Sequence, residues 1–151
     1  MPLNASVASH NSVHVHDGGN VILHPEDNDL FMRTGKQVIE ACRLGISIEV
    51  WLNEFAAMAA EVAQWAGRHA ERVRSCYCVP VGARITLFFS PRSDSFDFDL
   101  AELLAELNAD LNKQFNLGMV EVRQVPFQQI DRFLDPEKAL LVYADPGAGP
   151  H

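Results

Sequence analysis

The sequence predicts an α+β (or small α/β) fold: a two-layer sandwich with a mixed sheet of about four strands. Three observations favour it. Residues 84–126 have the pattern of a strand, a helix and a second strand, while residues 47–74 carry the longest helical periodicity in the chain. Residues 75–81 are rich in strand-forming side chains. The expected arrangement is a β-α-β crossover unit, with the long amphipathic helix packed on one face of the sheet.

The crossover unit is expected because a connection that contains a helix suits two parallel strands. Residues 84–90 carry apolar side chains on both faces, which is typical of a strand inside a sheet. Leucines at helical spacing predict a helix over 99–115, and a second strand follows at 119–126. In the preceding strand, Pro80 lacks an N–H group, which predicts either an edge strand or a bulge at that position.

The long helix is predicted to begin at Ser47, a good N-cap residue, and to run to Arg74. At that length it would span roughly 40 Å, more than the width of a small domain. Either Gly67 interrupts it, or one end protrudes and meets a partner. Small side chains lie on one of its faces and would let a second helix approach closely, which predicts a homodimer; these are Ala56, Ala60 and Ala63. The alternative is that alanine is present only as the best helix former.

The remaining segments complete a single domain over residues 13–144, between disordered tails at 1–12 and 145–151. A short hairpin is expected over 13–23, because Asp17-Gly18-Gly19 separates two short runs of strand formers.

Three further elements have weaker patterns. A helix is predicted from about Gly35 to Leu44, where Gly45 ends it. A short helix is predicted over 127–134, and residues 140–144 are either a final buried strand or the end of a helix.

The composition limits the functional classes. The chain has 151 residues with 20 acidic and 12 basic side chains, a formal net charge of -8 and a pI near 5.1. That balance disfavours nucleic-acid binding, which relies on Lys and Arg to neutralise phosphates. Three cysteines are too few for a disulfide framework, and no secretory signal or membrane span is recognisable. We therefore expect a cytoplasmic protein that needs no cofactor.

The most distinctive charge pattern is an acidic stripe on the 99–115 helix, opposite its leucines. Its members recur at helical spacing: Asp99, Glu102, Glu106 and Asp110. One interpretation is a solvated face. The other is a docking surface for a basic partner protein.

Basic residues gather at the end of the long helix, at Arg68, Arg72 and Arg74. Cations there complement the negative end of the helix dipole, which explains them without a ligand. The alternative is an anion-binding site.

A possible metal site lies near the N-terminus, where His14 and His16 alternate along a predicted strand, followed by Asp17. Alternate strand residues project from one face, so two imidazoles can share a divalent ion. Asp94 or Asp97 would complete the site of a small metal-dependent hydrolase. The alternative is a solvated hairpin.

No stretch matches a catalytic signature such as a nucleotide-binding loop or a Ser-His-Asp set. The sequence therefore favours a non-catalytic protein-interaction or regulatory module that self-associates. The alternative hypotheses are the metal-dependent hydrolase and, third, nucleic-acid binding through the arginine cluster.

Overall fold

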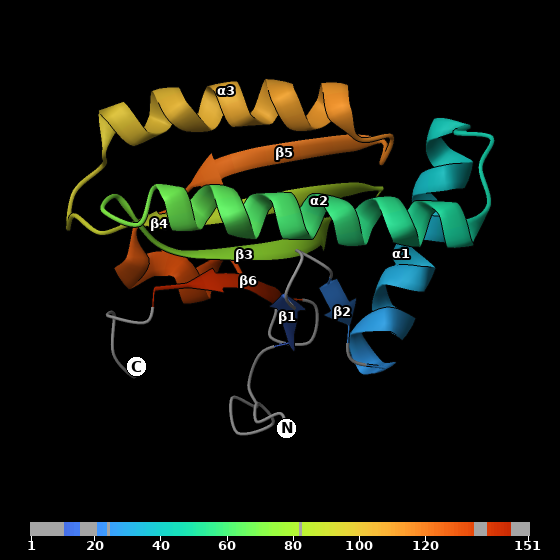
Figure 1. Ribbon diagram of the computed structural model, residues 1–151. Helices are drawn as coiled ribbons and strands as arrows, with labels where there is room; N and C mark the ends of the chain where they lie inside the picture. Colours follow the sequence, from blue (N-terminus) through green and yellow to red (C-terminus); the bar gives the residue numbers. More distant parts are fainter. Residues whose placement is uncertain (1–10, 16–20, 24, 82, 135–138, 146–151) are drawn as a thin grey trace.

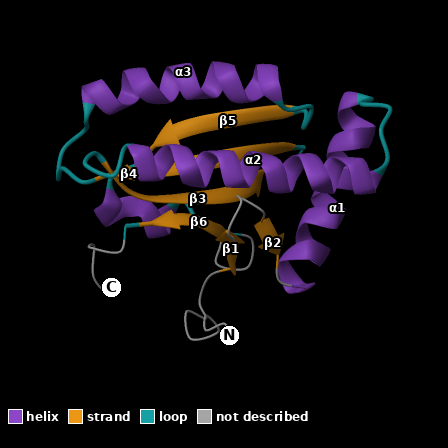
Figure 2. Ribbon diagram, in the orientation of Figure 1, coloured by secondary structure: helices purple, strands orange, loops and turns teal. Residues whose placement is uncertain are grey.

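The computed structural model describes residues 11–15, 21–23, 25–81, 83–134 and 139–145. The chain forms these elements in order: β1 (Asn11–Val15), β2 (Val21–Leu23), α1 (Pro25–Cys42), α2 (Ile48–Arg68), β3 (Val73–Val81), β4 (Arg84–Pro91), α3 (Phe98–Gln114), β5 (Met119–Gln124), the 3-10 helix η2 (Phe127–Arg132) and β6 (Leu140–Ala144). Helices and strands both contribute, as Figure 2 shows, so the predicted α+β class is confirmed.

The strands form one mixed sheet in the order β2-β1-β6-β3-β4-β5. Four neighbouring strands, β6 to β5, match the predicted number, and β1 and β2 extend the sheet beyond β6. β3 pairs antiparallel with both β4 and β6, whereas β4 pairs in parallel with β5. α3 connects β4 to β5 in the chain, so the predicted strand–helix–strand order of residues 84–126 is present.

The three α-helices share one large core with the sheet. Figure 1 shows α2 in front of the sheet, running in nearly the same direction as β3 and β4, and α3 running beside β5. Side chains from β3 and β4 alternate into this core, and its fully buried members include Phe31, Val38, Trp51, Phe55, Met58, Cys76, Ile85, Leu87, Phe89, Leu100 and Leu140. A smaller cluster contains Val79, Phe88 and Ile130, where η2 covers part of the opposite face of the sheet.

The N-terminal part of the domain is more regular than the sequence predicted. β1 begins at Asn11, so Asn11 and Ser12 belong to the sheet and not to the predicted tail; their backbones pair with Leu140 and Leu141 of β6. β1 and β2 pair antiparallel, as the predicted hairpin requires. Residues 140–144 form a strand, which decides the alternative that their pattern left open.

α1 begins at Pro25, ten residues before the predicted start at Gly35. Proline is well suited to the first helical position, where its missing N–H has no partner to lose. The buried side chains of Leu30 and Phe31 hold the added turns against the core. Gly35 therefore lies inside the helix, where the sequence pattern alone indicated a boundary.

α2 begins where predicted, because the Ser47 side chain accepts a hydrogen bond from the Val50 N–H at 3.2 Å. It ends at Arg68 and not at Arg74, so its 21 residues span about 31 Å. A turn follows, in which the Val73 N–H donates to the His69 carbonyl at 2.9 Å. Gly67 does not interrupt the helix.

β3 is an interior strand, so the prediction of an edge strand at Pro80 was wrong. The register shifts of β3 lie at Val73/Ser75 and at Cys76/Tyr77, so Pro80 does not mark a bulge either. The reason is local. Among the described residues, β6 pairs with β3 only from Ser75 to Cys78, so Pro80 lies beyond this ladder and its missing N–H removes none of the ladder's hydrogen bonds.

β5 is the edge strand beside α3, and asparagine side chains pair with its free backbone groups. Asn112 accepts a hydrogen bond from the Val120 N–H at 2.9 Å and donates one to the Val120 carbonyl at 2.7 Å. One helical turn earlier, Asn108 accepts from the Val122 N–H at 2.8 Å. These contacts occupy the groups that another strand would use, so they oppose strand addition at this edge.

Asn112→Ala is expected to destabilise the protein by about 1–3 kcal/mol, because Val120 loses both side-chain partners at once. Chemical denaturation monitored by circular dichroism measures the change. Asn53→Ala is the matched control, since Asn53 is an exposed helical asparagine whose side chain makes no hydrogen bond with any described residue. Equal effects of the two substitutions would contradict this role of Asn112.

Candidate functional site

The candidate site is the outer surface of α3. Its helix is amphipathic, because leucines at helical spacing face the core; Leu100, Leu104, Leu107 and Leu111 are all buried. The helix starts at an N-cap, Asp97, whose carboxylate accepts a hydrogen bond from the Leu100 N–H at 3.0 Å. The position and rotation of α3 are therefore determined by its leucines and its cap.

The acidic face of α3, formed by Asp99, Glu102, Glu106 and Asp110, is exposed along its whole length. The Asp99 carboxylate lies 3.4 Å from the Arg72 guanidinium, with 74% of its side chain exposed. No ion pair joins the other three carboxylates to any residue in the described part of the chain. Three adjacent unpaired carboxylates on one helix produce a negative potential that attracts a cationic partner.

Two exposed aromatic rings lie at the start of this acidic face, and sequence reasoning did not single them out. Phe96 is 47% exposed and Phe98 is 76% exposed. Their ring centroids are 4.9 Å apart, with the planes at 70°. Two phenylalanines in an aspartate-rich loop, outside the leucine periodicity, were the only sequence signal for them.

A cavity of about 400 Å³ adjoins the aromatic pair, between α3 and β5. Its apolar lining comes from Phe96, Ala101, Leu104 and Ala105, together with Val122. Its β5 side also carries Glu121, Arg123 and Gln124. The surface beside the acidic face is therefore apolar on α3 and polar on β5.

The three arginines predicted as an anion site point to different partners. Arg68 lies 3.8 Å from Glu61 of its own helix, and the Arg74 guanidinium carbon lies 3.7 Å above the Phe127 ring centroid. Arg72 donates two hydrogen bonds to the Asp97 carboxylate, at 3.0 and 3.1 Å, and so connects the turn after α2 to the cap of α3. Each of the three guanidinium groups therefore contacts a different residue of the chain.

The small side chains predicted to form a dimer contact are largely covered within the chain. Ala60 is buried, with 7% exposed, whereas Ala56 and Ala63 are half-buried. The exposed small residues of α2 are instead Ala57 and Gly67. Self-association through the predicted alanines remains a prediction.

The predicted metal ligands fall mainly outside the described residues. His14 lies in β1 opposite Ile22 of β2, but His16 and Asp17 are not among the residues that the structure describes. Within the described ranges, no three His, Cys, Asp or Glu side chains are grouped so that they could hold a metal ion. Asp94 and Asp97 contact Gln128 and Arg72, respectively. The hydrolase hypothesis remains a prediction.

Cys76 and Cys78 are buried in β3, and neither forms a disulfide. Burial raises the pKa of the Cys76 thiol well above its ordinary value, and it raises that of Cys78 in the same direction. Both groups are therefore neutral thiols near pH 7 and poor nucleophiles. Their role is to fill the core.

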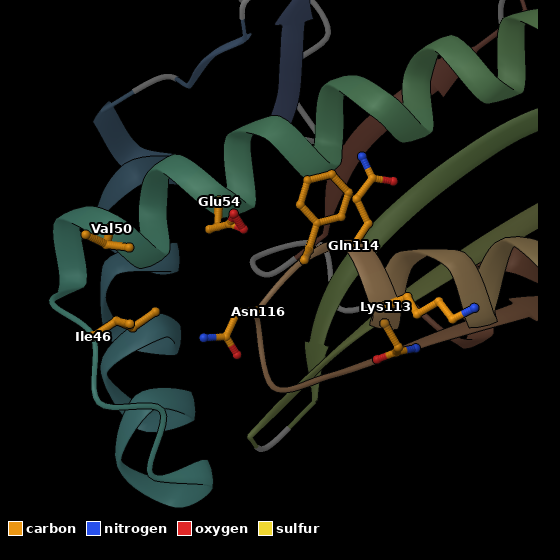
Figure 3. Close-up of a pocket in the computed structure, with 8 residues that line it drawn as sticks. Ile46, Val50, Glu54, Lys113, Gln114 and Asn116 are labelled. Carbon is orange, nitrogen blue, oxygen red and sulfur yellow. The ribbon is translucent and has the colours of Figure 1, made fainter.

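A second cavity, of about 440 Å³, lies between the start of α2 and the end of α3. Figure 3 shows Ile46 and Val50 on one side of it, with Asn116 between them and α3. Lys113 extends away from Ile46 and Val50 in this view. The cavity thus combines an apolar wall with uncharged amides, and its charged lining residues are Glu54 and Lys113.

None of the helices in the described ranges is both long enough and apolar enough to cross a membrane. No family model, no curated protein and no solved structure shows a significant match to this chain.

Proposed function

We propose that this protein is a non-catalytic protein-interaction or regulatory module that binds a basic partner protein through the acidic face of α3. The observation that carries the proposal is the set of three exposed carboxylates, Glu102, Glu106 and Asp110, without an ion-pair partner among the described residues. A formal net charge of -8 adds long-range attraction for a cationic partner.

The mode of binding is recognition of a helix surface. Strand addition at β5 is disfavoured, because Asn108 and Asn112 already pair with the backbone of Val120 and Val122. The carboxylates of α3, by contrast, can form ion pairs with a partner without any rearrangement of the backbone. Such contacts increase the association rate and select against acidic partners.

The test is the affinity of a labelled octalysine peptide, measured by fluorescence anisotropy at fixed ionic strength. The triple variant Glu102→Gln, Glu106→Gln, Asp110→Asn is expected to bind about tenfold more weakly than the natural chain, because attraction from the acidic face is lost. Circular dichroism checks that the variant keeps its fold.

The matched control neutralises three exposed acids elsewhere, Glu40→Gln, Glu49→Gln and Glu71→Gln. It changes the net charge by the same amount and leaves α3 intact. If both triple variants weaken binding equally, net charge alone explains the attraction, and the acidic face is not the binding surface.

Self-association is the second part of the proposal. Its support is the outer surface of α2, where Val50, with 48% exposed, lies about two turns before the exposed Ala57. In sedimentation velocity over a range of concentrations, we expect a species of twice the 16.8 kDa chain mass. A single species of 16.8 kDa at all concentrations would rule out this part.

A further inference from the structure

The exposed aromatic pair at the start of α3 has no role in the core. Phe98 exposes 76% of its surface and Phe96 47%, whereas Leu100, Leu104, Leu107 and Leu111 of the same helix are buried. Exposed aromatic residues beside a cavity with a partly apolar lining are characteristic of binding surfaces, where they act as anchors for a partner. The cavity of about 400 Å³ between α3 and β5 begins at Phe96.

The aromatic pair is continuous with the acidic face. Phe98 and Glu102 are four residues apart in α3, and Glu106 follows after four more, so the three side chains lie on the same side of the helix. An exposed ring and two unpaired carboxylates are therefore aligned along about two turns of helix.

An exposed ring beside unpaired carboxylates favours arginine over lysine as the side chain of the partner. A guanidinium group is planar and weakly hydrated, so it can stack on an aromatic ring while it forms a bidentate contact with a carboxylate. A lysine ammonium is compact and strongly hydrated, so it gains less from an exposed ring. The alkyl chain of arginine can also lie along the apolar lining of Ala101 and Ala105.

We propose that the surface formed by Phe96, Phe98 and Glu102 binds an arginine-rich segment of the partner protein. This inference rests on the proposed function and specifies its partner. Charge complementarity requires a cation at Glu102, and the neighbouring rings select arginine over lysine. Arg123 lies on the β5 side of the cavity, so the incoming guanidinium is placed on the α3 side, away from it.

The test compares labelled octaarginine and octalysine peptides on the same protein at the same ionic strength. The natural chain is expected to bind octaarginine more tightly. The double variant Phe96→Ala, Phe98→Ala should lower the ratio of the two affinities about threefold, through weaker octaarginine binding and with octalysine binding unchanged. The control is Phe133→Ala, which removes a ring that is 48% exposed in the segment after η2 and should leave the ratio unchanged.

The outcomes separate this inference from the proposed function. If the double variant has the same ratio of octaarginine to octalysine affinity as the natural chain, the arginine proposal is overturned. This holds even if neutralising Glu102, Glu106 and Asp110 still weakens the binding of both peptides. An equal loss of affinity for both peptides in the double variant also overturns it, because the rings then do not discriminate between arginine and lysine. If neither peptide binds the natural chain, both proposals fail.

Discussion

Gly35→Ala is expected to destabilise the protein by about 1–3 kcal/mol, although alanine is the better helix former. The reason is the close contact between α1 and α2. A methyl group at residue 35 would lie 2.7 Å from the Ile48 Cδ1 atom and 2.9 Å from the Trp51 Cδ2 atom. Trp51 is fully buried and its ring stacks on Phe55, with centroids 5.5 Å apart, so it cannot move aside without disturbing the core.

Gly67→Ala is the matched control and should change stability in the opposite direction. Gly67 lies in α2, and a methyl group there meets no heavy atom of the described chain within 4 Å. Helix propensity alone then predicts a gain of about 0.5–1 kcal/mol. Urea denaturation measures both changes through the transition midpoint. Two variants that shift the midpoint in the same direction would contradict the packing argument.

Asp97→Ala is expected to lower the free energy of unfolding by about 2 kcal/mol at pH 7, because it removes the cap of α3 and the ion pair to Arg72 together. Asp97→Asn separates the two contributions, since asparagine is also a good N-cap but carries no charge. It should therefore recover part of the loss. Asp110→Ala is the control on the same helix, where an exposed and unpaired aspartate should contribute little.

The contribution of Asp97 to the stability of the fold should depend on pH. The Leu100 N–H, and with it the Arg72 guanidinium, lowers the pKa of the Asp97 carboxyl below its ordinary value of 3.8, while burial acts in the opposite direction. A lowered folded-state pKa means that the ionised form stabilises the fold above the ordinary value, and that this contribution is lost as the pH falls through the folded-state pKa. The difference in free energy of unfolding between the natural chain and Asp97→Ala, measured by urea denaturation, should therefore become smaller as the pH is lowered from 5. A difference that grows on acidification would contradict this assignment.

Several parts of the fold were predictable because local patterns determine them. The start of α2 follows from the Ser47 cap, and the orientation of α3 follows from its leucine spacing. The acidic face follows from the same periodicity, since carboxylates opposite buried leucines are exposed. For the candidate site, the sequence thus predicted the charges, although not the aromatic rings beside them.

The incorrect predictions concern contacts between distant residues. Pro80 by itself indicates an edge strand, but proline also fits an interior strand where the neighbouring strand does not reach it. Among the described residues, the pairing of β6 with β3 ends at Cys78. Gly35 was predicted to start a helix, but it lies inside α1 because Trp51, sixteen positions along the chain, occupies the space that a larger side chain would need. The pairing of Asn112 with Val120 likewise depends on how α3 lies over β5.

By itself, the sequence determined the type and order of most elements, the cap of α2 and the acidic face of α3, because periodicity and capping act within a few residues. Only the tertiary structure decided that β3 is interior, that asparagines pair with the β5 edge and that Phe96 and Phe98 remain exposed. An apolar side chain is buried only if another surface of the protein packs against it. Those surfaces come from distant parts of the chain, so local pattern does not predict them.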